Sequence, residues 1–306
     1  MKIPCNKRRI IVFEYKYKIP KTELSTTYGS ITIKNIVFDP SELEKVLPEI
    51  IFDDESLKLM FAEECLNDFN RRNIYRRFIP KFENEKELEE FIDKSVQENK
   101  TFYSFLAEGL LGLIFNDIYK YKLAKGVIDI NDTLNDTHTG VDACMYNTEE
   151  QIIVLGEAKF YQKLNEGIER IIKDFIEKNI SNKLESLQRG IQNCDESNRI
   201  VIKNLSLNEY DEITIEQFMQ QKIIFAGFVL HSATDISQYN KKEFYDNYNI
   251  SSELLYKNIC KALKSDAIKC NYEIIIIHLP IKDKKELIAK IIETSRKKLD
   301  IMKGNI

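Results

Sequence analysis

Two glycine-containing segments of this chain fit a single antiparallel hairpin, and that hairpin constrains the fold around it. The first segment is Gly140-Val141-Asp142 and the second is Gly156-Glu157-Ala158-Lys159. The only turn-like residues between them lie at 147–151, with strand-like sequence on both sides. A short loop at 148–151 pairs Asn147 with Ile152. Continuing the same ladder predicts that Asp142 lies opposite Glu157.

This predicted hairpin gathers two acids and one amine. Facing residues of an antiparallel pair have Cβ atoms ~4.5–5.5 Å apart, which is close enough for Asp142 and Glu157 to hold one divalent ion. Lys159 follows Glu157 by two residues and therefore projects from the same face of the strand. The arrangement favours a metal-dependent phosphodiesterase site.

Three other triplets of the form (D/E)-x-K compete with Glu157-Ala158-Lys159. They are Glu14-Tyr15-Lys16, Glu98-Asn99-Lys100 and Asp283-Lys284-Lys285. Glu14 follows strand-like sequence, but no acid precedes it that could supply a second ligand. The other two lie in polar, helix-like or turn-like sequence. For Glu157 itself, an ordinary Glu–Lys pair on a solvated sheet face remains the alternative.

The pattern resembles the signature of the PD-(D/E)xK nuclease superfamily, in which an acid on one strand precedes (D/E)-x-K on the next. Gly140-Val141-Asp142 stands for the first half, with Val141 in place of the proline, and Glu157-Ala158-Lys159 for the second. The longer match, Leu155-Gly156-Glu157-Ala158-Lys159-Phe160-Tyr161, is similar to the nuclease subunit of the Hachiman anti-phage defence system. The resemblance is concentrated near residues 101–192.

This resemblance implies a metal-dependent DNA endonuclease that acts in anti-phage defence. Asp142, Glu157 and the backbone carbonyl of Ala158 would bind Mg²⁺ or Mn²⁺, and Lys159 would orient the attacking water and stabilise charge on the phosphorus. The resemblance also implies a separate helicase subunit. The chain itself has no P-loop motif, so ATP-driven unwinding would have to come from that partner.

Glu108 is the candidate for a further metal ligand. Residues 102–115 read as a helix that is apolar nearly all round, which predicts a buried helix. An ionised carboxylate inside it is costly unless it is paired or bound to a metal. The superfamily resemblance implies a metal-binding role for an acid on a helix before the sheet. A pairing of Glu108 with a lysine or arginine from another element is the alternative.

The element pattern predicts an α/β fold in two parts. Residues 96–306 are expected to form a nuclease-like domain with a restriction-endonuclease-like mixed sheet. Helices are expected on both faces of that sheet, because apolar runs such as 222–231 and 272–279 alternate with helical sequence. Residues 1–95 are expected to form an N-terminal α+β region packed on that core. It would contain strands at 8–18 and 30–38 around a turn at 27–29, and helices at 53–72 and 84–99.

Composition narrows the class of protein further. With 306 residues, 43% hydrophobic and 31% charged, the chain fits an ordinary globular protein without a membrane span or a signal-peptide core. Its six cysteines form no C-x-x-C pair and no Cys/His cluster, so we expect reduced thiols, no structural zinc and a cytoplasmic location. The net charge of −4 argues against a generally basic nucleic-acid-coating protein.

A nuclease needs only a local basic surface, and four clusters are candidates. They are Lys7-Arg8-Arg9, Arg71-Arg72 with Arg76-Arg77, Lys120-Lys122-Lys125 and Arg296-Lys297-Lys298. Each is compatible with a solvated face. The two arginine doublets are the most suggestive, because guanidinium groups bind phosphate in a bidentate manner.

The histidines and glutamines give weaker signals. His231 and His278 end apolar strands and are expected to be structural, whereas His138 lies four residues before Asp142 and could approach a phosphate. Gln188 lies on the helix expected at 164–192, where related nucleases sometimes carry a glutamine, and Gln162 and Gln192 are alternatives for the same role.

Two other functions fit the same residues. One is a sequence-specific restriction-type endonuclease, and the other is a non-catalytic binding module that uses a nuclease fold as a scaffold. A neighbouring helicase gene would separate the defence role from the restriction role.

Overall fold

The computed structural model describes eleven stretches of the chain, which are residues 25–28, 31–35, 47–48, 51–61, 66–79, 84–98, 104–123, 142–147, 149–177, 222–240 and 272–304. Their strands are β1 (Ser25–Tyr28), β2 (Ile31–Asn35), β3 (Lys122–Leu123), β4 (Ala143–Asn147), β5 (Ile152–Tyr161), β6 (Lys222–Ser232) and β7 (Tyr272–Ile281). Their α-helices are α3 (Asp54–Phe61), α4 (Asp68–Arg77), α5 (Glu85–Glu98), α6 (Ser104–Tyr119), α7 (Leu164–Glu177) and α12 (Lys284–Met302), and a 3₁₀ helix, η2, spans Ile236–Asn240.

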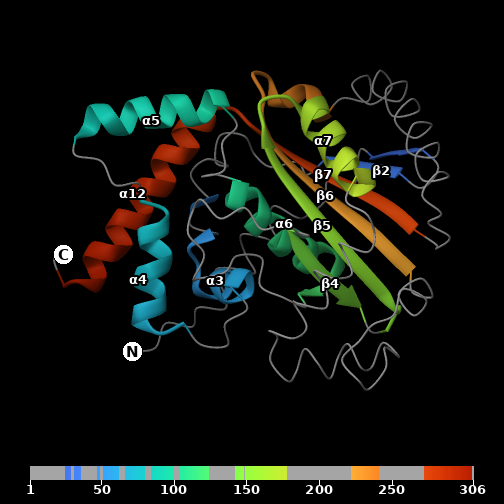
Figure 1. The fold of residues 1–306 in the computed structure, drawn as a ribbon, viewed down its shortest axis with the longest axis horizontal. Helices are drawn as coiled ribbons and strands as arrows, with labels where there is room; N and C mark the ends of the chain where they lie inside the picture. Colours follow the sequence, from blue (N-terminus) through green and yellow to red (C-terminus); the bar gives the residue numbers. More distant parts are fainter. Residues whose placement is uncertain are drawn as a thin grey trace.

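The seven described strands form one mixed sheet in the order β1-β2-β7-β6-β5-β4-β3. The four central strands β2, β7, β6 and β5 run parallel, and antiparallel pairs flank them on both sides. The central strands β5, β6 and β7 are long, nearly continuous apolar runs, as expected of a sheet that is covered on both faces. The predicted α/β fold with a mixed sheet is confirmed (Figure 1).

The predicted hairpin register is also confirmed within β4 and β5. Asn147 pairs with Ile152, and the ladder continues to Ala143 opposite Gly156. The tight turn ends at Gln151, a non-glycine residue with a φ of 52°. Because a shift of one residue would turn every side chain to the other face, this register decides which residues of β5 meet the site.

Helices cover the two faces of the sheet. On one face, α6 packs so closely on β5 that a Cβ at Gly156 would lie 2.7 Å from a Cδ atom of Leu111, and only glycine permits that approach. On the other face, Ile171 of α7 contacts Gly227 of β6 in the same way. In register, Gly227 is the neighbour of Glu157, so Glu157 projects toward α7.

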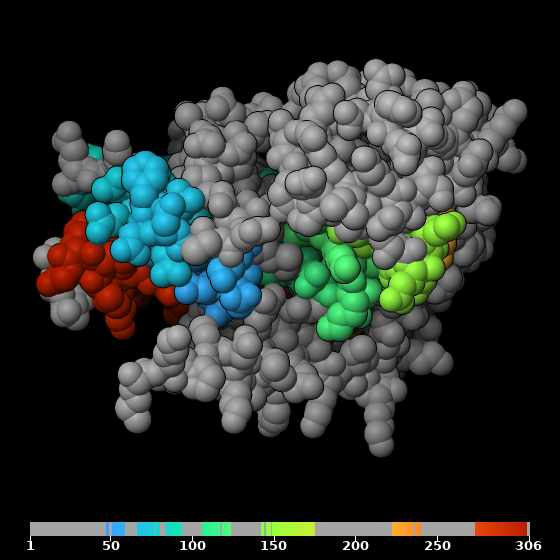
Figure 2. Space-filling view, turned by 90° about the horizontal axis from the view of Figure 1, so that it is seen from below, coloured from blue at the N-terminus to red at the C-terminus, as the bar shows by residue number. Residues whose placement is uncertain are grey.

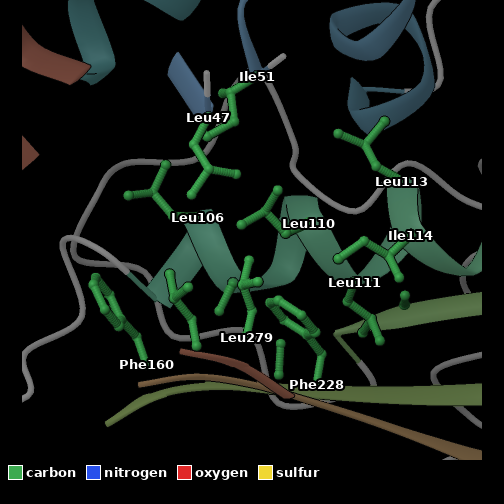
Figure 3. Packing of buried hydrophobic residues seen from close by; sticks show 14 of the residues in the cluster. Leu47, Ile51, Leu106, Leu110, Leu111, Leu113, Ile114, Phe160, Phe228 and Leu279 are labelled. Carbon is green, nitrogen blue, oxygen red and sulfur yellow. The ribbon is translucent and has the colours of Figure 1, made fainter. Parts of the chain in front are cut away.

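The helix α6 is apolar nearly all round because it is covered on two sides. Figure 3 shows Leu111, Phe160, Phe228 and Leu279 between α6 and the strands, and Leu47 with Ile51 on the opposite side of the helix. All of these side chains are buried. The prediction of a buried helix is therefore confirmed for residues 104–115, with the helix continuing to Tyr119.

The first part of the chain supplies both strands and helices to this assembly. The strand β2 pairs in parallel with β7, so residues before 95 extend the same sheet as residues 152–281. At one end of the molecule, α12 packs against α4 and α5 (Figure 1). None of the described helices is long and apolar enough to cross a membrane.

Two local expectations for this part were wrong. The single helix expected at 53–72 is two helices, because the side chain of Asn67 accepts a hydrogen bond from the Asn70 N–H at 2.8 Å and caps a new helix there. The turn expected at 27–29 does not include Thr27 and Tyr28, since both belong to β1 and Tyr28 pairs with Ile31 of β2. The strands expected at 8–18 and near 126–130 lie outside the described residues.

Candidate functional site

The site lies at the N-terminal end of β4, beyond which β5 continues without β4 as its partner. The last pair of the β4–β5 ladder joins Ala143 to Gly156, and the Asp142 N–H donates to the Gly156 carbonyl at 2.9 Å. One step further, the Asp142 carboxylate accepts a hydrogen bond from the Ala158 N–H at 2.7 Å. A side chain therefore occupies the place that a strand would otherwise take at this edge of β5.

The Asp142–Ala158 contact also orients the Ala158 carbonyl. In an antiparallel ladder the N–H and C=O of one residue point to the same side of the strand. The Ala158 carbonyl therefore points toward the edge that holds the half-buried Asp142 carboxylate. Two oxygen atoms of the expected metal site, one from Asp142 and one from Ala158, thus belong to the same edge.

Glu157 and Lys159 form a buried ion pair on the face covered by α7. The Glu157 side chain is fully buried, and the Lys159 Nζ lies 3.4 Å from its Oε2. The alternative of a solvated Glu–Lys pair on an exposed sheet face is wrong, because Glu157 has no exposure to solvent. A carboxylate in such a place is costly unless charge or hydrogen bonds compensate it.

Asp174 of α7 is a functional candidate that the sequence did not reveal. Its carboxylate is buried and lies 2.9 Å from the Lys159 Nζ, which is closer than Glu157. The second oxygen of Asp174 lies 3.1 Å from an Nη atom of Arg170, one turn earlier on the helix. The only signal in the sequence was an ordinary i,i+4 Arg–Asp pair, which gives no indication that its carboxylate is buried.

The three carboxylates determine the charge of Lys159. Burial alone would lower the pKa of its amine, but the charges of Asp142 and Glu157 and the hydrogen bond to Asp174 outweigh burial and raise the pKa well above its usual value. The amine is therefore cationic across the physiological range. It serves as a fixed positive charge and a hydrogen-bond donor, and it cannot act as a neutral base.

Glu108 is half-buried on α6, and the structure does not bring it into a three-carboxylate metal cluster. In the described ranges, no group of three or more His, Cys, Asp or Glu side chains lies close enough to hold a metal. Asp142 and Glu157 remain the candidate side-chain ligands. Gln188 and His138 lie outside the described residues.

The competing triplet at 283–285 has a structural role. Asp283 caps α12 by accepting a hydrogen bond from the Glu286 N–H at 2.9 Å. Lys284 is buried with its Nζ 4.2 Å from the centroid of the Phe160 ring, and burial lowers its pKa to about 8. Lys285 pairs with Asp93 of α5 at 2.8 Å. The three side chains thus point to three different neighbours.

The donors present fit a hard divalent cation. Asp142, Glu157 and the Ala158 carbonyl offer only oxygen, the ligand type that Mg²⁺ and Mn²⁺ prefer. These three donors include no sulfur and no imidazole nitrogen, so the set does not resemble a zinc site. The neighbouring Lys159 ammonium favours the ionised form of the buried Glu157 carboxylate, and an ionised carboxylate oxygen can bind a metal.

His231 and His278, 47 residues apart in sequence, meet inside the protein. They lie on the neighbouring strands β6 and β7, both fully buried, with His231 Nε2 3.1 Å from His278 Nδ1. The His231 Nδ1 lies 3.1 Å from the Ser232 carbonyl. A carbonyl only accepts, so His231 donates there and accepts from His278, which fixes both neutral tautomers. The ring of Tyr239 packs edge-on against both.

This pair predicts that the protein loses stability in mild acid. Burial lowers the pKa of His231 to about 4 and that of His278 well below its usual value. The unfolded chain takes up protons below a pH of about 6.5 whereas the folded chain does not, so stability is complete above that pH and falls toward pH 4. For His231 the loss is about 3 kcal/mol. Urea unfolding at pH 7.5, 6.5, 5.5 and 4.5 measures this loss of stability. If the free energy of unfolding of His231→Gln falls as steeply with pH as that of the wild type, His231 is not responsible for the loss.

The fold and the site together define a mixed-sheet α/β protein with an acid–lysine site at the open edge of its central hairpin. A family model described as HamA matches residues 7–294, and the chain therefore belongs to the HamA family. HamA is the nuclease-like protein of the Hachiman system, so this chain has a role in multi-component anti-phage defence. No curated protein matches the sequence.

Proposed function

We propose that the chain is a metal-dependent DNA endonuclease of the PD-(D/E)xK superfamily that works with a separate helicase subunit in Hachiman defence. The observation that carries this proposal is the edge of β5, where the Asp142 carboxylate and the Ala158 backbone meet beside the buried Glu157–Lys159 pair. Oxygen donors and a permanent cation side by side are the two elements that phosphodiester hydrolysis requires.

Each residue has a separate task in this proposal. Asp142, Glu157 and the Ala158 carbonyl would hold Mg²⁺ or Mn²⁺. The bound ion polarises the scissile phosphate and lowers the pKa of the attacking water. Lys159 would place its ammonium where negative charge develops on the phosphoryl oxygens. Asp174 would fix the direction of that ammonium, since its 2.9 Å contact is the shortest that the amine makes with a described carboxylate.

Glu108 has a lesser place in the proposal. Its position on α6, the helix that packs on β4 and β5, is compatible with a contribution from the other side of the sheet. Glu108 would contribute a further metal ligand, either directly or through a bridging water. The primary ligands remain Asp142, Glu157 and Ala158.

Metal dependence gives the direct test of the proposed activity. Purified protein, alone and with the co-encoded helicase, is incubated with plasmid and linear DNA. Cleavage is expected with Mg²⁺ or Mn²⁺ and is expected to stop when EDTA is added. Ca²⁺ is expected to bind but to support little turnover, because its loose coordination positions the attacking water poorly.

A phage-protection assay separates the nuclease from the non-catalytic scaffold. The complex in which Asp142, Glu157 and Lys159 are all alanine is expected to lose protection. Full protection by that triple variant would show that the fold serves only as a binding module. Cleavage confined to one short sequence, independent of the helicase, would instead favour the restriction-type endonuclease.

A further inference from the structure

Two of the basic clusters recognised in the sequence lie against each other in the fold. One is on α4 and the other is on the last three turns of α12, more than two hundred residues apart in the chain, and these two helices pack together. Four of their side chains are exposed: Arg72, Arg76, Arg296 and Lys297. We call these four residues the α4–α12 basic surface.

Two contacts fix how α4 and α12 are aligned. An Nη atom of Arg72 lies 3.3 Å from the Met302 carbonyl, and the Nζ of Lys298 lies 5.8 Å from the centroid of the Tyr75 ring. The contacts run in opposite order along the two helices, so the helices are antiparallel. Arg76, one residue beyond Tyr75, therefore lies near the turn of α12 that carries Arg296 and Lys297. Figure 2 shows both helices side by side at the surface.

The four cations of this surface form no ion pair with a described carboxylate, unlike most others on the described part of the protein, although Asp68, Glu293 and Asp300 lie one helical turn away from them. Ion pairs elsewhere join Lys58 to Glu55, Arg71 to Asp54, Lys86 to Glu90, Lys163 to Glu166, Lys222 to Glu273, Lys285 to Asp93 and Lys303 to Asp300. Within the described ranges, no carboxylate forms an ion pair with Arg72, Arg76, Arg296 or Lys297. Even on α4, Arg71 is paired whereas its neighbour Arg72 is not.

A cluster of cations without ion pairs calls for a physical explanation in an acidic protein. The whole chain carries a net charge of −4, so cations gathered on one surface are a local exception. Arg72 and Arg76 are an i,i+4 pair of like charge, an arrangement that destabilises a helix. An anionic partner that binds here relieves the repulsion between these cations, and this relief contributes to the free energy of binding.

Exposed apolar side chains border the same surface. Phe69 is 71% exposed one turn before Arg72 on α4, and Ile301 is 54% exposed next to Met302, which Arg72 contacts. They are the two large hydrophobic side chains of the described residues that stand out in solvent. An aromatic ring beside cations is the combination with which proteins bind phosphates and stack on unpaired bases.

We infer that the α4–α12 basic surface is a DNA-docking surface, where its four cations contact backbone phosphates and Phe69 stacks on a frayed or single-stranded base. The identity of the polyanion as DNA rests on the proposed nuclease function. The surface lies at the end of the molecule away from β5 and α7 in Figure 1, so it holds the substrate at a distance from the cleavage site. It contributes affinity and orientation, and it takes no part in the chemistry.

Salt-dependent binding tests this inference without cleavage. Binding of the full chain to a fluorescein-labelled duplex with a single-stranded overhang is followed by anisotropy in EDTA at several KCl concentrations. Each phosphate contact contributes ~0.9 to the slope of log affinity against log salt. The quadruple variant Arg72→Gln/Arg76→Gln/Arg296→Gln/Lys297→Gln is expected to lower that slope by about 3.6 and the affinity at least roughly tenfold.

A matched control changes the net charge equally at other lysines of the surface. Lys58→Gln/Lys86→Gln/Lys163→Gln/Lys222→Gln is expected to keep the wild-type slope. The double variant Arg296→Gln/Lys297→Gln avoids the Arg72–Met302 contact and is expected to lower the slope by about half as much, which guards against a folding defect. The inference would be overturned if the control variant lost as much DNA affinity and salt dependence as the variants of the α4–α12 basic surface, or if the wild type did not bind DNA.

Two further outcomes separate the possible failures. Patch variants that keep DNA binding but lose co-purification with the helicase would overturn the inference and assign the surface to a protein partner. Patch-dependent DNA binding by a wild-type protein that never cleaves DNA would support the docking surface and refute the proposed nuclease activity.

Discussion

Glu157→Gln is expected to lower DNA cleavage by at least about 100-fold while leaving the protein folded, because loss of a direct metal ligand costs more than loss of an outer-shell partner. Glutamine keeps the volume of the fully buried side chain, so no cavity forms. Lys159 keeps its 2.9 Å contact with Asp174 and therefore is not left as an unpaired buried cation.

Metal binding provides the second readout for the same variant. A ligand that binds only the folded state stabilises it by about 2.7 kcal/mol at one hundred times its Kd. Thermal unfolding with increasing Mg²⁺ is expected to show this stabilisation in the wild type and to lose it in Glu157→Gln. Glu150→Gln, in the exposed turn of the same hairpin, is the matched control and is expected to behave as wild type.

A different pattern would assign Glu157 a purely structural role. If Glu157→Gln unfolds several degrees lower, and Mg²⁺ stabilises it as much as it stabilises the wild type, then the carboxylate serves only as the partner of Lys159. The cleavage assay alone does not make this distinction, because an unfolded protein is also inactive. The two measurements together do.

The sequence was informative where local patterns decide the structure. The turn at 148–151 and the apolar residues on both sides of it were sufficient for the register of β4 and β5. The spacing of two residues along β5 was sufficient to place Glu157 and Lys159 side by side. The apolar circumference of α6 predicted a buried helix, and that helix has sheet on one side and Leu47 on the other.

The sequence was silent where distant elements meet. Asp174 reads as an ordinary surface residue of an amphipathic helix, and only the packing of α7 on β5 turns it toward Lys159. His231 and His278 pair because β6 and β7 are parallel neighbours, and the register between parallel strands has no hairpin to fix it. The cations of α4 and α12 that form no ion pair become neighbours only because these two helices pack together.

The edge of β5 explains why a short motif acquires chemical meaning only in this fold. The backbone of Ala158 would be paired if β4 began two residues earlier, and Asp142 would then be an ordinary cross-strand residue. Because β4 begins at Ala143, the Asp142 side chain reaches the Ala158 N–H. Termination of one strand thus converts a hairpin into a site with oxygen donors on one side and an ammonium group on the other.

Lys159→Ala is expected to abolish cleavage and to destabilise the metal-free protein by about 3 kcal/mol, because breaking a buried ion pair leaves its partners uncompensated. The partners here are Glu157, which is fully buried, and Asp174, whose side chain is 5% exposed. The raised pKa of Lys159 means that its contribution is complete at every pH below its ordinary pKa near 10.5 and is lost only in stronger alkali. The destabilisation is therefore expected to be the same at pH 7 and pH 9.

Magnesium is expected to act on this variant in the direction opposite to its effect on Glu157→Gln. Removing an ammonium group beside the ligands removes repulsion toward a divalent cation, so Lys159→Ala is expected to bind Mg²⁺ at least as tightly as wild type and to regain part of its lost stability. If Lys159→Ala loses Mg²⁺ binding as completely as Glu157→Gln does, the amine and the carboxylates do not have separate roles, and the proposed mechanism is wrong.

Asp174→Asn keeps both Glu157 and the amine, so it tests the orientation of the Lys159 ammonium without removing its charge. It is expected to reduce the cleavage rate about 10-fold to 100-fold with unchanged Mg²⁺ affinity, as for other partners that orient a reacting group.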